Sequence, residues 1–138
     1  MATRSLIIVD TDNTVTSQYC HWDGGLNGVG NTLATHYTTS EKLIKLRKLG
    51  ALSVLAPNCT KPKGHTFNTP VEGHCISYKR DRKEKGCNTV IHANLSDAIE
   101  SAGDMIAFIY VFTNNNWHVH VRNYLIPINQ QPDYMYVN

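Results

Sequence analysis

The chain has 138 residues, of which 41% are apolar and 17% charged, and a formal net charge of +2. This composition predicts one folded domain and excludes an extensively disordered chain, which combines few apolar residues with a strong net charge. The longest apolar run, residues 105–112, is too short to cross a bilayer, so we expect no membrane partner. Residues 6–9 form too short an apolar stretch for a secretory signal, and we expect an intracellular protein.

The first half of the sequence predicts a hairpin followed by two helices. Thr38 and Glu41 have the spacing of a capping box, and Gly50 stands where a helix normally ends. Between them, leucines recur along one side of a helix. The expected elements are strands over 6–9 and 14–22 joined by a turn at 10–13, a glycine-rich corner over 24–30, and helices over 31–37 and 41–49.

The second half predicts a long loop, one strand, one helix and another hairpin. In order these are a loop over 56–73, a strand over 74–82, a charged turn over 83–86, a helix over 95–102, and strands over 105–113 and 117–122. We therefore expect an α+β domain over 1–123, with an antiparallel sheet of about five strands and two or three short helices mainly on one face. Residues 124–138 are expected to form an extended tail that docks on the domain or on a partner subunit.

The string Tyr19-Cys-His-Trp-Asp-Gly-Gly25 marks the end of the second strand. On a strand, His21 and Asp23 share one face and Trp22 lies on the other. A carboxylate beside an imidazole suits a general base or a metal ligand. It equally suits a hydrogen-bonded pair that braces the corner beside a buried Trp22. The lack of a nucleophile or third ligand nearby in the sequence favours this structural interpretation.

The string Tyr78-Lys-Arg-Asp-Arg82 has two interpretations of equal weight. On a strand it places Tyr78, Arg80 and Arg82 on one face, where the ring stacks on a base and the guanidinium groups pair with phosphates. Alternatively, Asp81 pairs with its basic neighbours in a network that braces the fold. The two interpretations are compatible with each other.

The small net charge conceals an uneven distribution. Residues 42–85 contain eleven basic and three acidic side chains, a net of +8, so the remainder of the chain carries −6. Lysines on the exposed side of the helix over 41–49 would normally be a solvated surface. Together with Lys61, Lys63 and the basic residues over 79–85, these helix lysines predict an electrostatic footprint for a phosphate-rich partner. The binding residues expected on this basis are Trp22, Tyr37, Lys45, Lys48, Tyr78, Lys79, Arg80, Arg82 and Lys83.

Five sets of residues occur in order over residues 1–85. They are Met1-Ala-Thr-Arg-Ser5, Tyr19-Cys-His-Trp-Asp-Gly24, Gly28-Val-Gly30 with Leu33 and His36-Tyr37, Leu52-Ser53, and Tyr78-Lys-Arg-Asp-Arg82. On these motifs the chain resembles a widespread family of small uncharacterised proteins from phages and bacterial genomes. The resemblance implies a phage origin, an accessory role and the cytoplasm of an infected bacterium as location. It carries no activity.

The chain departs from the family pattern at three places. A Gly-Leu pair is inserted after Gly24, Lys79 replaces a small residue, and Lys83-Glu-Lys85 makes the following turn more basic. The added lysines favour a polyanionic partner for this chain.

Two further sets of side chains are candidates for metal binding or catalysis. His118 and His120 share a strand face, but a metal site needs another ligand, and the motifs of a two-histidine phosphoesterase are incomplete. The four cysteines are widely spaced and are expected to be free thiols; a zinc site drawn from His74, Cys75 and Cys87 is a weak alternative. We therefore expect no metal and no cofactor.

These patterns favour a non-enzymatic protein that binds single-stranded RNA or DNA through a basic and aromatic surface. The first alternative is a sponge that sequesters a nucleotide-type signal in a pocket built by the Trp22 corner with Arg80 and Arg82. The second alternative is a metal-assisted phosphoesterase that uses His21, Asp23, His118 and His120. A further one is an inhibitor that docks on a host protein through the Tyr-rich tail. A homo-oligomer is compatible with each of them.

Overall fold

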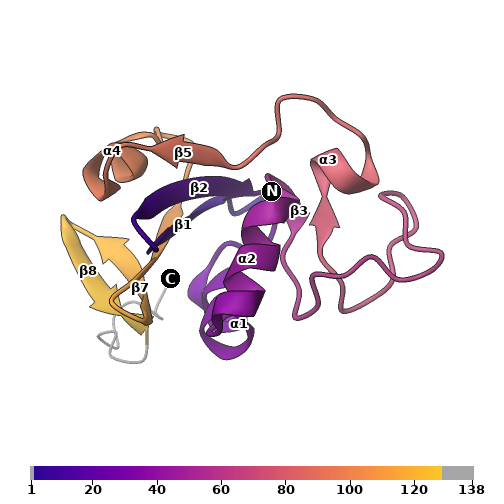
Figure 1. Ribbon diagram of the computed structural model, residues 1–138, viewed down its shortest axis with the longest axis horizontal. Helices are drawn as coiled ribbons and strands as arrows, with labels where there is room; N and C mark the ends of the chain where they lie inside the picture. Colours follow the sequence, from indigo (N-terminus) through magenta and orange to yellow (C-terminus); the bar gives the residue numbers. More distant parts are fainter. Residues whose placement is uncertain (1, 129–138) are drawn as a thin grey trace.

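The computed structural model describes residues 2–128, which form one mixed β-sheet with helices on both of its faces (Figure 1). The elements in chain order are β1 (Ser5–Thr11), β2 (Thr14–Cys20), the π-helical turn η1 (Leu26–Gly30), α1 (Asn31–His36), α2 (Ser40–Leu49), β3 (Leu52–Val54), β4 (Ile76–Ser77), α3 (Tyr78–Asp81), β5 (Val90–His92), α4 (Leu95–Glu100), β6 (Phe108–Thr113), β7 (Asn116–Val121) and β8 (Tyr124–Pro127).

The sheet is larger than the expected five strands and is not purely antiparallel. Its order is β4-β3-β2-β1-β6-β7-β8, and β5 pairs with β2 beside β3. The hairpins β1–β2 and β6–β7 are antiparallel as expected, but β1 runs parallel to β6 and β2 parallel to β3. The expectation missed β3 and β5, which have three residues each, because so short a segment shows no alternation of its own.

Alternation along β1 separates the core into two layers. Ile7 and Val9 pack on the side covered by α1 and α2, whereas Leu6 and Ile8 pack on the side covered by α4. Figure 1 shows α1 and α2 below the strands and α4 above them. The expectation that the helices lie mainly on one face therefore holds for α1 and α2 and is wrong for α4.

Helix α2 forms where its leucine spacing predicts, one residue earlier than expected. Thr39, rather than Thr38, is the N-cap, and its side chain accepts the amide of Lys42 at 3.2 Å. The helix is tied to the sheet by Arg47, which donates to the hydroxyl of Thr16 at 3.0 Å and to the carbonyl oxygens of Val9 and Thr14 at 2.9 and 3.0 Å.

The predicted strand over 74–82 is wrong for most of its length. Only Ile76 and Ser77 pair with β3, and the chain then turns into α3. Ser77 caps this helix by accepting the amide of Arg80, while the carboxylate of Asp81 accepts the amide of Ser77. These reciprocal bonds satisfy the backbone amides of Arg80 and Ser77. The polar side chains of Ser77 and Asp81 therefore favour a helical turn over a continued strand.

The expected boundary at residue 124 falls inside the sheet. Tyr124 to Pro127 form β8, which pairs antiparallel with β7. The first part of the expected tail is thus an edge strand, and the rest of it, including the Tyr-rich end, lies outside the described residues.

The glycine-rich corner gives a test of the fold. A Cβ at Gly28 would overlap the carbonyl oxygen of Asp23, which accepts the Val29 amide at 2.8 Å. We expect Gly28→Ala to lower the free energy of unfolding by about 2–3 kcal/mol, measured by urea denaturation.

Gly25→Ala is the matched control, because nothing lies within 4 Å of the place that a Cβ would occupy and the φ of −71° suits any residue. It should change stability by less than about 0.5 kcal/mol. Equal losses of unfolding free energy in Gly28→Ala and Gly25→Ala would contradict the backbone conformation described for the glycine-rich corner.

Candidate nucleic-acid interface

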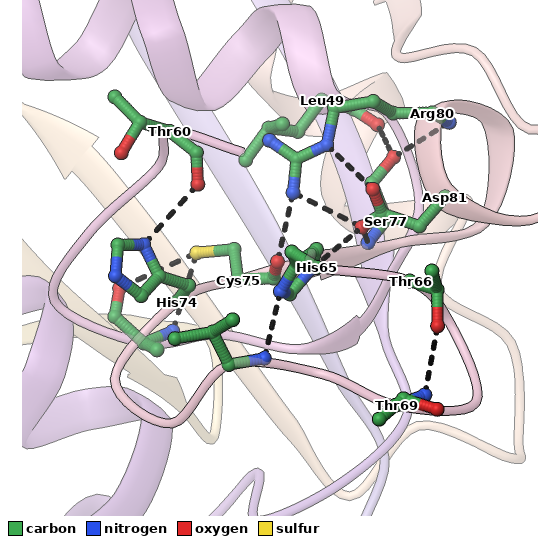
Figure 2. A network of polar contacts seen from close by, with 12 residues as sticks. Leu49, Thr60, His65, Thr66, Thr69, His74, Cys75, Ser77, Arg80 and Asp81 are labelled. Carbon is green, nitrogen blue, oxygen red and sulfur yellow. Dashed lines mark hydrogen bonds and ion pairs between the residues drawn. The ribbon is translucent and has the colours of Figure 1, made fainter. Parts of the chain in front are cut away.

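The candidate site lies where β3 and β4 meet the long loop over residues 56–75. At its base is Asp81, whose side chain is fully buried. This carboxylate accepts the amide of Ser77 at 2.8 Å and the guanidinium of Arg80 at 2.8 and 3.0 Å (Figure 2). His65, from the loop, makes a further hydrogen bond to it at 3.3 Å. Arg80, His65 and the backbone amide of Ser77 thus surround one buried negative charge.

His65 and Arg80 attach the loop to this carboxylate. The Nδ1 atom of His65 accepts the amide of Val71 at 3.0 Å, so Nε2 carries the ring proton and donates it to the carboxylate. Arg80 also donates to the carbonyl oxygens of Cys59 and Cys75, at 2.6 and 2.9 Å. Loop, strand and helix are therefore joined through a single ion pair.

The electrostatics of Asp81 favour its charged form. Burial by itself raises the pKa of this carboxyl. The hydrogen bonds from Arg80 and Ser77, together with the charge of Arg80 and the electrostatic effect of the neighbouring His65 ring, outweigh burial, and the pKa is lowered below its usual value. Asp81 is consequently an anion at neutral pH and a fixed partner for Arg80.

Arg80 is not placed beside Tyr78 and Arg82 as the strand hypothesis requires. The helical turn directs it inward, and its donors are used by the carboxylate and the two loop carbonyls. The bracing interpretation of the string therefore describes Arg80 and Asp81. The interpretation as a ligand surface remains for Tyr78 and Arg82 only.

Tyr78 and Arg82 form an exposed stack with a ring from the loop. The guanidinium carbon of Arg82 lies 4.5 Å from the ring centre of Phe67 and 4.8 Å from that of Tyr78. The two rings are themselves 5.6 Å apart. Arg82 also pairs with Glu84, but about half of its side chain remains exposed. This arrangement presents an exposed guanidinium group beside two partly exposed aromatic rings.

A second aromatic group lies at the end of β2. The Tyr19 hydroxyl is 2.5 Å from Nδ1 of His21, and the His21 ring meets Trp22 edge to face at 4.7 Å. His21 therefore bonds Tyr19 rather than Asp23, and the expected His–Asp pair is replaced by a Tyr–His pair. Trp22 is 43% exposed, which excludes the expectation of a buried indole.

The two groups lie close to each other. The side chain of Tyr19 lies on the α4 side of the sheet, because Tyr19 pairs with Leu6, which faces α4. Burial raises the pKa of Tyr19, Arg4 opposes the rise, and Tyr78 is close enough to add to it. We call this surface the aromatic face, defined by Arg4, Tyr19, His21, Trp22, Phe67, Tyr78 and Arg82.

The expected binding residue Tyr37 is not on the aromatic face. Its ring has no exposed area, and its hydroxyl donates to the carbonyl oxygen of Ala56 at 2.6 Å. Its backbone oxygen accepts the indole N–H of Trp117 at 2.8 Å, so the residue is part of the core under α1 and α2. It offers no stacking surface to a ligand.

The lysines of α2 lie on the other side of the sheet from the aromatic face. Lys45 pairs with Glu41 at 3.1 Å, and Lys48 is exposed. Lys79 donates to the side chain of Asn88 at 3.2 Å, while Lys83 is exposed in the turn after α3. The basic residues over 42–85 therefore do not form one surface. Of the lysines predicted to bind a ligand, Lys83 stands next to Arg82 in the sequence.

A cavity of about 650 Å³ opens at the glycine-rich corner, close in sequence to Trp22. Its lining is mixed, with two glycines, apolar residues such as Leu26 and Leu55, and the polar residues Thr3, Asn27 and Thr32, and Asp23 is the one charged residue among those that line it. Neither Trp22 nor Arg80 nor Arg82 contributes to it. The cavity has the volume of a ligand pocket, but its lining supplies an anion where a phosphate requires a cation.

The histidines of β7 lie apart from the corner residues in the fold. Trp117 and Val119 face the core, so His118 and His120 occupy the other side of their strand, as predicted. Within residues 2–128, no group of three or more His, Cys, Asp or Glu side chains is arranged to hold a metal ion.

Sequence reasoning missed three residues that build the site: Tyr19, Phe67 and His65. Tyr19 stands two positions before His21, and this spacing on a strand signals a shared face. Phe67 and His65 belong to a loop without periodicity, and their roles depend on contacts far along the chain.

No family model, curated protein or solved structure matches this chain. None of the described helices is long and apolar enough to cross a membrane.

The Asp81 network predicts a pH-dependent loss of stability. Asp81→Asn should lower the free energy of unfolding by about 3 kcal/mol near neutral pH, because it leaves the buried Arg80 without its counter-charge. The pKa of Asp81 is lowered in the fold, so its contribution is full above about pH 5 and declines below about pH 4. The difference in the free energy of unfolding between the wild type and Asp81→Asn, measured by urea denaturation, should therefore become smaller as the pH falls.

Glu84→Gln is the control, since this carboxylate is exposed and, among residues 2–128, pairs with Arg82 and Cys87 alone. A change of less than about 0.5 kcal/mol is expected. A gap between Asp81→Asn and the wild type that stays constant down to pH 3 would show that the Asp81 charge does not stabilise the fold.

Proposed function

We propose that the chain is a non-enzymatic protein that binds single-stranded RNA or DNA across the aromatic face. The observation that carries the proposal is the proximity of two aromatic groups: Tyr19 and Trp22, which both contact His21, and Tyr78, which stacks with Phe67 and Arg82. Every base has a ring face that stacks on such side chains, so binding requires no particular sequence.

The charges on this side suit the backbone of a strand. Arg82 keeps its guanidinium flat against two rings, and Arg4 lies close enough to Tyr19 to affect its pKa. Lys83 and Lys85 extend the positive charge beyond Arg82. Cations of this kind neutralise phosphates and release counterions, so the affinity should fall as salt rises.

Trp22 and Arg82 are each nearly half exposed, and no aromatic-face residue lines the cavity at the glycine-rich corner, which favours a strand over a single enclosed nucleotide. The cavity beside it would enclose a small molecule, but its lining residues provide no cation for a phosphate. The sponge hypothesis is therefore the less supported of the two. The accessory phage role implied by the sequence resemblance remains part of the proposal and is compatible with strand binding.

Fluorescence anisotropy with a labelled single strand of about 20 nucleotides tests the proposal. We expect micromolar binding at about 50 mM salt and weaker binding at about 200 mM. Trp22→Ala and Tyr78→Ala should each reduce affinity about 5- to 100-fold, since each removes a stacking surface worth about 1–3 kcal/mol.

Tyr124→Ala is the matched control, because Tyr124 is 71% exposed on β8, at the opposite end of the sheet. It should bind as the wild type does. The absence of strand binding at low salt, or salt-tolerant stoichiometric binding of a mononucleotide alone, would overturn the proposal, and the second result would support the sponge.

The division of the basic residues gives a separate prediction. Arg82→Ala should weaken strand binding several-fold and make the dependence of log affinity on log salt shallower by about one. Lys48→Ala removes one charge from α2, on the side away from the aromatic face, and should leave both quantities unchanged. Equal effects from the two variants would indicate a diffuse electrostatic surface instead of a defined one.

A further inference from the structure

Two cysteines, Cys59 and Cys75, lie side by side although they are far apart in sequence. Asn58 and His74 form an isolated parallel bridge, and the amide of Cys75 donates to the carbonyl oxygen of Asn58 at 2.9 Å. Each cysteine directly follows one of the two bridged residues. The backbone thus holds the two cysteines on neighbouring segments.

Their sulfur atoms converge on one hydroxyl group. The Sγ atoms of Cys59 and Cys75 lie 3.2 and 3.3 Å from the Oη atom of Tyr37. Cys59 and Cys75 each stand one position beyond the Asn58–His74 bridge, so their side chains lie on the same side of the two segments. Cysteines on adjacent backbone segments with facing side chains have the geometry from which a disulfide forms with little movement.

The surroundings make the two sulfurs chemically different. Hydrogen bonding from Cys75 lowers the pKa of Cys59 against the effect of burial, and Tyr37 and Lys42 lower it further. The ammonium group of Lys42 lies 4.5 Å from the ring centre of Tyr37. The Cys59 side chain, together with burial, raises the pKa of Cys75. Cys59 is therefore the sulfur of the pair that loses its proton more readily, and Cys75 remains a thiol.

Access favours the same assignment. Cys59 retains 7% of its surface, whereas Cys75 has none. The other two cysteines are less reactive, because burial raises the pKa of Cys20 to about 12 and the hydrogen bond to Glu84 raises that of Cys87.

We propose that Cys59 and Cys75 are a redox-active dithiol that a hydroperoxide oxidises to an intramolecular disulfide. The Cys59 thiolate attacks one peroxide oxygen, the O–O bond breaks, and hydroxide leaves, which yields a sulfenic acid. The Cys75 sulfur then attacks the Cys59 sulfur, the S–O bond breaks, and water leaves with the Cys75 proton. The two electrons lost by the sulfurs reduce the peroxide.

The cross-link would close the segment that carries His65 and Phe67. Both of these loop residues contribute to the binding site, His65 through Asp81 and Phe67 through its stack with Arg82. The dithiol chemistry itself does not depend on nucleic-acid binding and is tested without any strand.

The test treats the reduced full chain with a small excess of hydrogen peroxide. We expect the free thiols to fall from four to two, the intact mass to decrease by two hydrogen atoms, and non-reducing peptide mapping to identify the Cys59–Cys75 link. Four remaining thiols, a link involving Cys87, or intermolecular dimers as the main product would overturn the proposal.

Variants separate the roles of the two sulfurs. Cys75→Ser should stop the reaction at a sulfenic acid on Cys59, detected as a dimedone adduct, and Cys59→Ser should abolish oxidation of Cys75. Cys87→Ser is the matched control and should form the disulfide at the wild-type rate. The mapping of the wild-type chain decides the question even where a variant fails to fold.

Discussion

The buried charge of Asp81 is the constraint on which the described site depends. A carboxylate without solvent is costly unless it is paired, and this one is paired by Arg80, Ser77 and His65, which come from three different elements. Satisfying it requires the long loop to close against α3 and the end of the sheet. That closure places Phe67 beside Tyr78. Arg82 stacks on the Phe67 ring and remains partly exposed to solvent.

The same constraint changes the meaning of the basic segment. A net of +8 over residues 42–85 first indicates one phosphate-binding footprint. In the fold, Arg80 is enclosed by carbonyl oxygens and a carboxylate, Arg47 fastens α2 to the sheet, and Lys45 of α2 pairs with Glu41. The charge therefore serves two purposes, bracing and surface attraction, and only part of it is available to a ligand.

Local patterns predicted the elements that local interactions decide. The first hairpin and the leucine spacing of α2 needed no distant partner to be recognised. The strand over 74–82 failed because Ser77 and Asp81 cap a helical turn, and β3, β4 and β5 exist only through pairing. The same limit applies to the site residues Tyr37 and Trp22, which the sequence makes equally suitable for stacking. Tyr37 is enclosed in the core and Trp22 is exposed, because contacts from other elements decide their burial.

Photo-crosslinking can decide whether a single strand lies across the aromatic face. The strand would contain 5-bromouracil, and peptide mass spectrometry would locate the crosslinked residues. We predict crosslinks on the peptides that carry Tyr19, Trp22 and Tyr78. Crosslinks confined to α2, residues 40–49, or none at protein concentrations that bind the strand, would contradict binding across this face.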